Sequence, residues 1–275
     1  AAANETSALI LDTRNVQTFA AGFVPNSINI AIDGSFAPWV GAMIPDIKQE
    51  ILLVTEEGRE EEVITRLARV GYDFTIGYLK GGIAAWKAAG KELDQIESIS
   101  VEETLNRAQS GEGEIIDVRK NSEYLSEHIV DVENAPLDFI NESMLKIKKD
   151  KTYFVHCASG YRSMIFISTL RARGYENLID VQGGFKAIKE SEKFKLSEIQ
   201  ATAILDMQLR KRDTVKELKD RLREAQEAKT DLEKAKQDPM RTGELGSLTR
   251  GSMKTLQALK EALDEAAHEI VSPNR

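Results

Sequence analysis

The residues with the clearest chemical potential surround the only cysteine of the chain, Cys157. An apolar run, Tyr153 to His156, leads into Cys157, small residues follow, and an amphipathic stretch runs from Arg162 to Arg173. A strand, a tight loop and a helix in this order can aim several backbone N–H groups, and the positive end of the helix, at one point. A cysteine at that point is favoured as the thiolate, its nucleophilic form. The candidate site is therefore Cys157 with the loop residues Ala158, Ser159, Gly160, Tyr161, Arg162 and Ser163.

Five residues in or near this loop have separate expected roles. Gly160 allows a backbone curvature that a β-carbon would hinder. Arg162 adds a cation at the mouth of the loop, and we expect it to be exposed beside an anionic substrate. Asp117 and Arg119 follow an earlier apolar run, and we expect them to form a structural pair that braces the end of the sheet near the loop. For His156, next to the cysteine, we expect packing rather than acid–base chemistry.

The chain contains an internal repeat, which identifies the elements that must position this loop. Asp-x-Arg follows an apolar run twice, and the Gly-Tyr and Gly-Gly pairs of the first half recur in the second, at Asp12, Gly71, Gly81 and Asp117, Gly174, Gly183. In each half, short apolar runs alternate with amphipathic stretches. This pattern is typical of an α/β domain with a mainly parallel sheet flanked by helices.

The repeat divides the chain into three parts. Copy one is expected over residues 1–95, copy two over 96–194, and a helical appendage over 195–275. Copy one lacks a counterpart of the opening strand and helix of copy two, Ile99 to Ala108, so we expect it to be truncated at its start. In the appendage, apolar residues recur at three- and four-residue steps on two stretches separated by Asp238-Pro239. The expected structure is a C-terminal α-helical hairpin, whose apolar faces favour self-association.

Copy two carries an ordered set of motifs: Asp117-Val118-Arg119, Glu123-Tyr124, His128-Ile129, the loop from Cys157 to Ser163, Gly174-Tyr175 and Gly183-Gly184. Together with the matching motifs of copy one, this set resembles the rhodanese family over roughly residues 8–190. The resemblance implies two rhodanese-like domains and a sulfurtransferase. Cys157 would take a sulfane sulfur from thiosulfate or a persulfide and pass it to an external thiol or cyanide.

Copy one departs from this pattern at the decisive position. Thr55 stands where copy two has Cys157, and acidic residues follow at Glu56, Glu57 and Glu60. A threonine is a nucleophile only with dedicated activation, and the acids would repel an anionic donor. Copy one is therefore predicted to be inactive.

Two further resemblances cover little of the chain. The stretch from Phe36 to Pro45 looks like part of the rhodanese tail of proteins that begin with a metallo-β-lactamase-fold hydrolase. The stretch from Lys195 to Arg210 looks like a helix of the DNA gyrase A subunit, but it implies no topoisomerase activity, because the DNA-cleaving region has no counterpart here.

Two other functions compete with sulfur transfer. The motif His156-Cys157-x-x-Gly160-x-Arg162 is close to that of cysteine phosphatases, but those enzymes place one residue more between the cysteine and the arginine, so that the loop wraps a phosphate. The shorter loop suits a single sulfur atom on the thiolate. The other alternative is a non-catalytic rhodanese-fold module for binding or assembly.

The composition excludes further classes. The net charge of −8 weighs against nucleic acid as the main partner. The apolar runs are far shorter than the ~18 residues of a membrane helix, and no leader-like segment opens the chain. One cysteine and three scattered histidines indicate neither an intramolecular disulfide nor a metal site. We expect a cytoplasmic protein without metal or other cofactor, and without a membrane or nucleic-acid partner.

Overall fold

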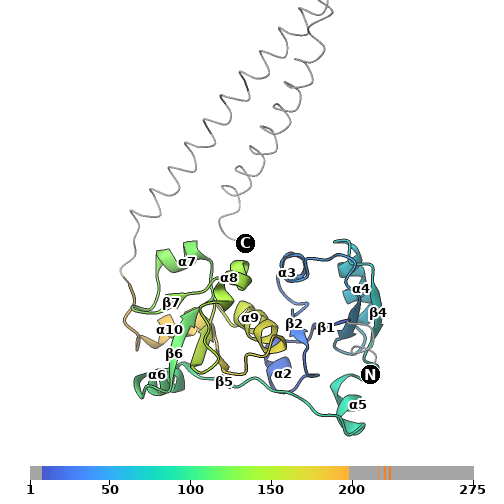
Figure 1. The fold of residues 1–275 in the computed structure, drawn as a ribbon, viewed down its shortest axis with the longest axis horizontal. Helices are drawn as coiled ribbons and strands as arrows, with labels where there is room; N and C mark the ends of the chain where they lie inside the picture. The colour runs from blue at the N-terminus through green and yellow to red at the C-terminus, as the bar shows by residue number, and fades with distance from the viewer. Residues whose placement is uncertain (1–7, 198–215, 217–219, 221–222, 224–275) are drawn as a thin grey trace, which may run out of the picture. The chain divides into compact units, whose positions relative to one another are not determined.

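The computed structural model describes residues 8–197 together with residues 216, 220 and 223. The chain divides into two compact units, Ala1–Ile199 and Gln200–Arg275, and the first of them contains both copies of the repeat (Figure 1). The hairpin predicted for residues 195–275 lies almost wholly outside the described residues.

Copy one is built on a four-stranded sheet in which every neighbouring pair of strands is parallel. The order is β2-β1-β3-β4, with β1 Leu9–Asp12, β2 Ile28–Asn29, β3 Ile51–Val54 and β4 Thr75–Tyr78. Its helices are α2 Val16–Ala20, α3 Phe36–Met43, α4 Glu60–Ala68 and α5 Gly82–Ala88. Parallel neighbours require crossover connections, which α4, for example, provides between β3 and β4.

Copy two is built on a five-stranded parallel sheet in the order β5-β9-β8-β6-β7. The strands are β5 Ser98–Ile99, β6 Gly113–Asp117, β7 Glu133–Asn134, β8 Thr152–His156 and β9 Leu178–Val181. The helices are α6 Val101–Gln109, α7 Asn121–Ser126, η1 Leu137–Phe139, α8 Ile140–Met144, α9 Tyr161–Ala172 and α10 Gly184–Ser191. The predicted class, two α/β domains with parallel sheets flanked by helices, is confirmed.

The strand β5 and the helix α6 have no counterpart in the described part of copy one. In copy two, β5 covers the edge of β9, pairing Ser98 with Asp180. In copy one the counterpart of β9 is β4, and β4 is the edge strand of its sheet. Phe74, Ile76 and Tyr78, in and next to β4, are therefore each nearly half exposed.

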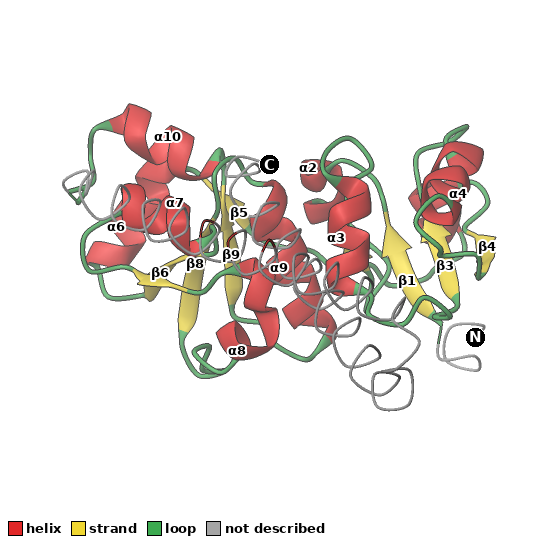
Figure 2. Cartoon of the chain, turned by 90° about the horizontal axis from the view of Figure 1, so that it is seen from above, coloured by secondary structure: helices red, strands yellow, loops and turns green. Residues whose placement is uncertain are grey.

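One hydrophobic cluster runs through both copies and includes Leu11 and Phe19 of copy one with Phe166 and Leu170 of α9. Helix α9 lies between the two sheets in both ribbon views (Figures 1 and 2). Its residues from Ser163 to Leu170 are all buried. The predicted amphipathic face of this helix is wrong, because copy one covers the side that would face water in an isolated domain.

Polar contacts also join the two copies. The backbone N–H of Asn29 donates to Ser168 Oγ at 2.9 Å. Arg171 of α9 forms an ion pair with Asp94, from Nη2 to Oδ1 at 2.6 Å. The copies are thus one packed body rather than two domains on a free linker.

The end of copy two extends slightly past the predicted boundary at residue 194. The N–H of Val130 donates to Lys195 O at 2.9 Å, and the N–H of Ser197 donates to His128 O at 2.7 Å.

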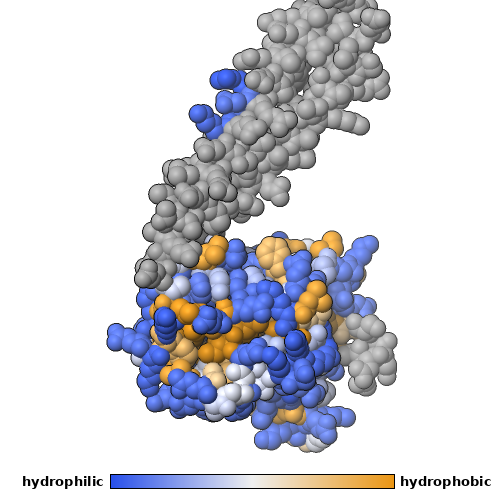
Figure 3. Space-filling view, turned by 60° about the vertical axis from the view of Figure 1, so that its left-hand side comes forward, coloured by the Kyte–Doolittle hydropathy of each residue, from blue (hydrophilic) through white to orange (hydrophobic). Residues whose placement is uncertain are grey.

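On the face drawn in Figure 3, hydrophobic residues gather in a central band bordered by hydrophilic ones. Among the described residues, no helix has both the length and the apolar character needed to cross a membrane.

Candidate active site

The candidate nucleophile lies where parallel strand β8 ends. His156 is the last residue of β8, Cys157 follows, and α9 begins at Tyr161. Cys157 is only 1% exposed. The backbone N–H of Gly160 donates to Cys157 Sγ at 3.1 Å, which shows the expected inward turn of a loop N–H towards the sulfur. Gly160 has a φ of +102°, a conformation that disfavours residues with a β-carbon.

The start of α10 holds this loop from the other side. The N–H of Phe185 donates to Cys157 O at 2.7 Å, and the N–H of Lys186 donates to Ala158 O at 3.1 Å. A β-carbon on Gly184 would lie 2.5 Å from Cys157 O, so only glycine allows this approach. The sequence shows the Gly183-Gly184 pair within the repeat, but not its contact with the loop, because that contact depends on β9 lying beside β8.

Arg162 differs from its predicted role. Its side chain is 15% exposed, and its Nη2 donates to Glu123 Oε1 at 2.8 Å, with a second bond from Nη1 to Oε2. The expectation of an exposed cation at the mouth is therefore wrong. Burial alone would lower the pKa of Arg162, but the hydrogen bonds that Arg162 donates to the Glu123 carboxylate, together with the charge of that carboxylate, outweigh burial and raise that pKa. Glu123, which follows β6, is 39 residues away in sequence, so only the fold reveals the pair.

Asp117 and Arg119 form the predicted pair at the end of β6. Arg119 donates from its backbone N–H to Asp117 Oδ1 at 2.9 Å and from Nη2 to Oδ2 at 2.6 Å. Both side chains are buried. The amide of Asn134 adds bonds to the carbonyls of Asp117 and Arg119 at 2.9 and 3.0 Å. In copy one, Asp12, Arg14 and Asn29 repeat the same arrangement.

His156 is fully buried beside this pair. Its Nε2 lies 3.9 Å from Asp117 Oδ2 without a hydrogen-bond partner, and its ring stacks on Phe185 at 6.0 Å. Burial lowers the pKa of His156 below 6.5, an effect that the Asp117 charge only partly opposes. A neutral, buried imidazole is the arrangement expected of a packing residue.

Copy one contacts the candidate loop directly through Tyr161. The Tyr161 hydroxyl donates to Ala31 O at 2.8 Å. The ring also lies against Gly34, where an added β-carbon would be 2.6 Å from Cε2. Burial raises the pKa of Tyr161 above its ordinary value, so its hydroxyl stays a donor at neutral pH. Tyr161 is the residue between Gly160 and Arg162, so copy one helps to set the loop's position.

The matching loop of copy one lacks these features. Thr55 is 7% exposed, and its hydroxyl has no hydrogen-bond partner in the structure. Gly82, the counterpart of Gly184, has no atom within 4 Å of its would-be β-carbon, and α5 buries no residue. Arg59 in this loop pairs with Asp33, from Nη1 to Oδ2 at 2.7 Å. Neither the sulfur nor the bracing helix of copy two is reproduced.

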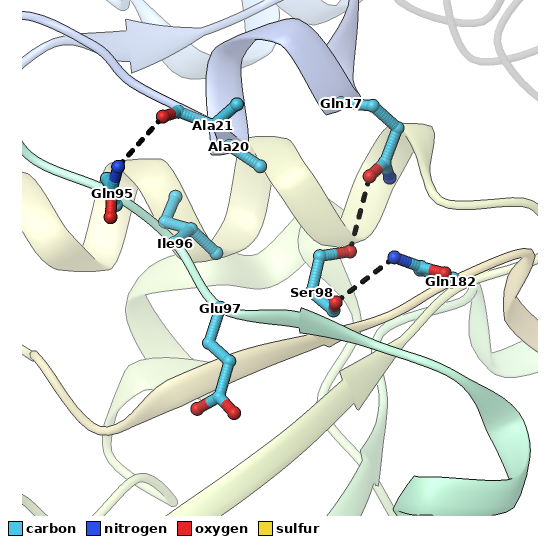
Figure 4. Close-up of a pocket in the computed structure, with 8 residues that line it drawn as sticks. All are labelled: Gln17, Ala20, Ala21, Gln95, Ile96, Glu97, Ser98 and Gln182. Atoms are coloured by element: carbon cyan, nitrogen blue, oxygen red, sulfur yellow. Dashed lines mark hydrogen bonds between the residues drawn. The ribbon is translucent and has the colours of Figure 1, made fainter.

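A separate pocket of about 640 Å³ lies between α2, the segment from Gln95 to the first residue of β5, Ser98, and Gln182 (Figure 4). None of its lining residues belongs to the Cys157 loop. In the part of the chain that the structure describes, no group of three or more His, Cys, Asp or Glu side chains is placed to hold a metal ion.

Comparison with known proteins gives consistent matches. Residues 1–89 and 100–191 match the rhodanese-like domain family. An uncharacterised protein of Synechocystis sp. is 36% identical over 77 residues, which are 28% of this chain and 43% of that protein. The putative sulfur carrier protein YrkF of Bacillus subtilis is 28% identical over 108 residues, 39% of this chain and 56% of its own.

Among solved structures, a rhodanese-related protein of Thermoplasma volcanium is similar with 28% identity and a TM-score of 0.34, covering 37% of this chain and 97% of that one. The chain spans less than two thirds of the length of the two curated relatives named above. These matches do not bear on the resemblances to metallo-β-lactamase-fold fusion proteins and to gyrase A, which stay predictions.

Proposed function

The chain belongs to the rhodanese-like domain family, a family of sulfur transfer, and on that premise we propose that copy two is a sulfurtransferase with a persulfide intermediate on Cys157. The observation that carries the proposal is the Gly160 N–H aimed at Cys157 Sγ at the C-terminal end of β8. This N–H is a hydrogen-bond donor to the sulfur, and Cys157 is the only thiol of the chain.

The proposed reaction has two balanced steps. The Cys157 thiolate attacks the outer sulfur of thiosulfate, the S–S bond breaks, and sulfite leaves with the electron pair. The terminal sulfur of the Cys157 persulfide is then attacked by cyanide or an external thiol, which restores the thiolate. Because the chain has no second cysteine, the acceptor comes from outside it.

The groups around Cys157 have two roles, because some donate hydrogen bonds to the sulfur and others hold the loop in place. The Gly160 N–H binds the anionic sulfur, while the N–H groups of Phe185 and Lys186 in α10 bind the carbonyls of Cys157 and Ala158. Arg162 and Glu123 carry no net charge as a pair. We therefore assign Arg162 the role of fixing the start of α9, rather than that of a free cation for the donor.

Two observations weigh against phosphatase chemistry. Only four residues separate Cys157 from Arg162. The Arg162 guanidinium is bound by Glu123 and not free to grip a phosphate. The non-catalytic role fits copy one, whose Thr55 replaces the nucleophile and whose loop is acidic.

The test compares turnover of thiosulfate, with cyanide as acceptor, against turnover of an aryl phosphate. We expect sulfur transfer by the intact chain, none by the Cys157→Ser variant, and no phosphate release by either. A Thr55→Cys, Cys157→Ser double variant should stay inactive, because Glu56 and Glu57 remain beside the new thiol and disfavour its thiolate. Phosphate release that depends on Cys157, or sulfur transfer that survives Cys157→Ser, would overturn the proposal.

A further inference from the structure

A buried carboxyl group with no cation beside it lies one strand away from the Cys157 loop. Asp180, in β9, is 0% exposed. Its Oδ1 lies 2.8 Å from Ser163 Oγ, and its Oδ2 lies 2.7 Å from Ser98 Oγ. The other buried aspartates of the two sheets, Asp12 and Asp117, each have an arginine partner. Burying a carboxyl without such a partner is costly, which calls for an explanation.

Ser163 links this carboxyl to the residue that holds the cysteine. Ser163 Oγ lies 3.1 Å from Gly160 O as well as 2.8 Å from Asp180 Oδ1. Gly160 is the residue whose N–H donates to Cys157 Sγ. A serine hydroxyl has one hydrogen to donate, so Ser163 can donate to Gly160 or to Asp180 but not to both. Which of the two it serves depends on whether Asp180 itself carries a proton.

We propose that Asp180 is a positioning residue for the Cys157 loop, acting through Ser163 on Gly160. With its proton on Oδ1, Asp180 donates to Ser163 Oγ, and Ser163 donates to Gly160 O. As a carboxylate, Asp180 accepts the Ser163 hydrogen, and Gly160 O loses that donor. The inference rests on the proposed function of Cys157. It adds that the protonation state of Asp180 determines how firmly the Cys157 loop is held.

In the described part of the chain, no charged side chain faces Asp180, so the protonation state of Asp180 decides whether Ser163 donates to Gly160 O. It is faced by Ser98 from β5, Val155 from β8, Ser163 from α9 and Gln17 from α2, all of them uncharged. Burial raises the pKa of Asp180 above 3.8, and hydrogen bonds from Ser98, Ser163 and Gln17 offset this only in part. The raised pKa favours the protonated form of Asp180 more than it is favoured in an exposed aspartate.

The same network reaches copy one. Ser98 Oγ lies 3.4 Å from Gln17 Oε1 of α2, and the amide of Gln182 donates to Ser98 O at 3.1 Å. Figure 4 shows Ser98 between these two glutamines at the wall of the pocket between the copies. Asp180 thus connects the Cys157 loop to the junction between the two copies.

The first test measures how fast iodoacetamide alkylates Cys157 in the full chain, from acidic to neutral pH. Since Cys157 is the only thiol, this rate reports on the loop whether or not the chain transfers sulfur. Asp180→Asn should match the wild type at acidic pH, because its amide donates to Ser163 as the protonated acid does. At neutral pH the two rates should differ by about three- to tenfold, the effect of one hydrogen bond.

Second-site variants separate positioning from general stability. In a Ser163→Ala background, Asp180→Asn should have no further effect on the alkylation rate or on kcat for thiosulfate. Thr169→Val removes another buried hydroxyl of α9, one without a hydrogen-bond partner, and should change neither rate. Identical pH profiles for Asp180→Asn and the wild type, or an undiminished effect of Asp180→Asn in the Ser163→Ala background, would overturn the inference. If thiosulfate is not turned over at all, the proposed function fails while the alkylation result still decides the role of Asp180.

Discussion

The contact between copy one and the Cys157 loop predicts that a single methyl group in copy one impairs sulfur transfer. Gly34→Ala places a β-carbon 2.6 Å from Tyr161 Cε2 and 2.9 Å from Cζ. Ordinary contact begins near 3.4 Å, and the Tyr161 hydroxyl is tied to Ala31 O, so the ring cannot simply turn away. The residue after Gly160 must therefore shift.

The size of the effect follows from the size of the shift. The ring must retreat by about 0.8 Å, and displacements of about 1 Å near a reacting group cost up to roughly a hundredfold in rate. We expect kcat/KM for thiosulfate to fall by about ten- to a hundredfold, measured by thiocyanate formation with cyanide in excess. Gly34 does not have a positive φ, so the alanine adds no backbone strain of its own.

Two controls isolate the contact. Gly41→Ala, in α3 of the same copy, has no atom within 4 Å of the added β-carbon and should keep full activity. In a Tyr161→Ala background, Gly34→Ala should cost nothing further, because the ring it would strike is gone. Unchanged kcat/KM in the Gly34→Ala variant would refute the reasoning, as would an equal loss in the Gly41→Ala variant.

Three other predictions concern charge, pH and the tail. Arg162→Ala should lower kcat/KM by roughly ten- to a hundredfold, because it leaves Glu123 without its ion-pair partner at the start of α9. The double variant Arg162→Ala, Glu123→Gln should recover part of that loss. Equal activity of the single and the double variant would contradict this prediction. The folded-state pKa of His156 lies below 6.5, so its contribution to stability is present above pH 6.5 and is lost as pH falls through the folded-state value. Urea unfolding at several pH values should show this loss in the wild type and a shallower one in His156→Gln, and parallel curves would count against a buried neutral His156. Removing residues 200–275 should leave sulfur transfer intact and change the oligomeric state seen by light scattering, and a folded but inactive truncated chain would contradict the assignment of the site to the first unit.

Local features of the fold were predictable from the sequence. Strand β3 coincides with one of the short apolar runs of copy one, Ile51–Val54. Asp117 and Arg119 pair as predicted, because residues two apart at a strand end point to the same side. The loop after Cys157 was predictable for a similar reason: a strand, small residues and a helix follow one another without a break.

Features that depend on distant segments were not predictable. The helix α9 reads as amphipathic, yet copy one buries its second face. Arg162 reads as an exposed cation, yet Glu123 neutralises it from another element. Asp180 carries no motif at all, and its contact with Ser163 exists only because β9 lies beside β8 and beneath α9. In each case the deciding contact joins residues that are far apart in the sequence and that only the tertiary fold brings together.

The central claim is that Cys157 carries the transferred sulfur, and intact-mass measurement of the chain after treatment with thiosulfate tests it most directly. The account predicts a gain of one sulfur atom, located at Cys157 by fragmentation, lost on addition of cyanide, and absent from the Cys157→Ser variant. It also predicts that Thr55→Ala gains the sulfur as the wild type does. A chain that turns over thiosulfate without ever gaining the sulfur, or a Cys157→Ser variant that still gains it, would contradict the account.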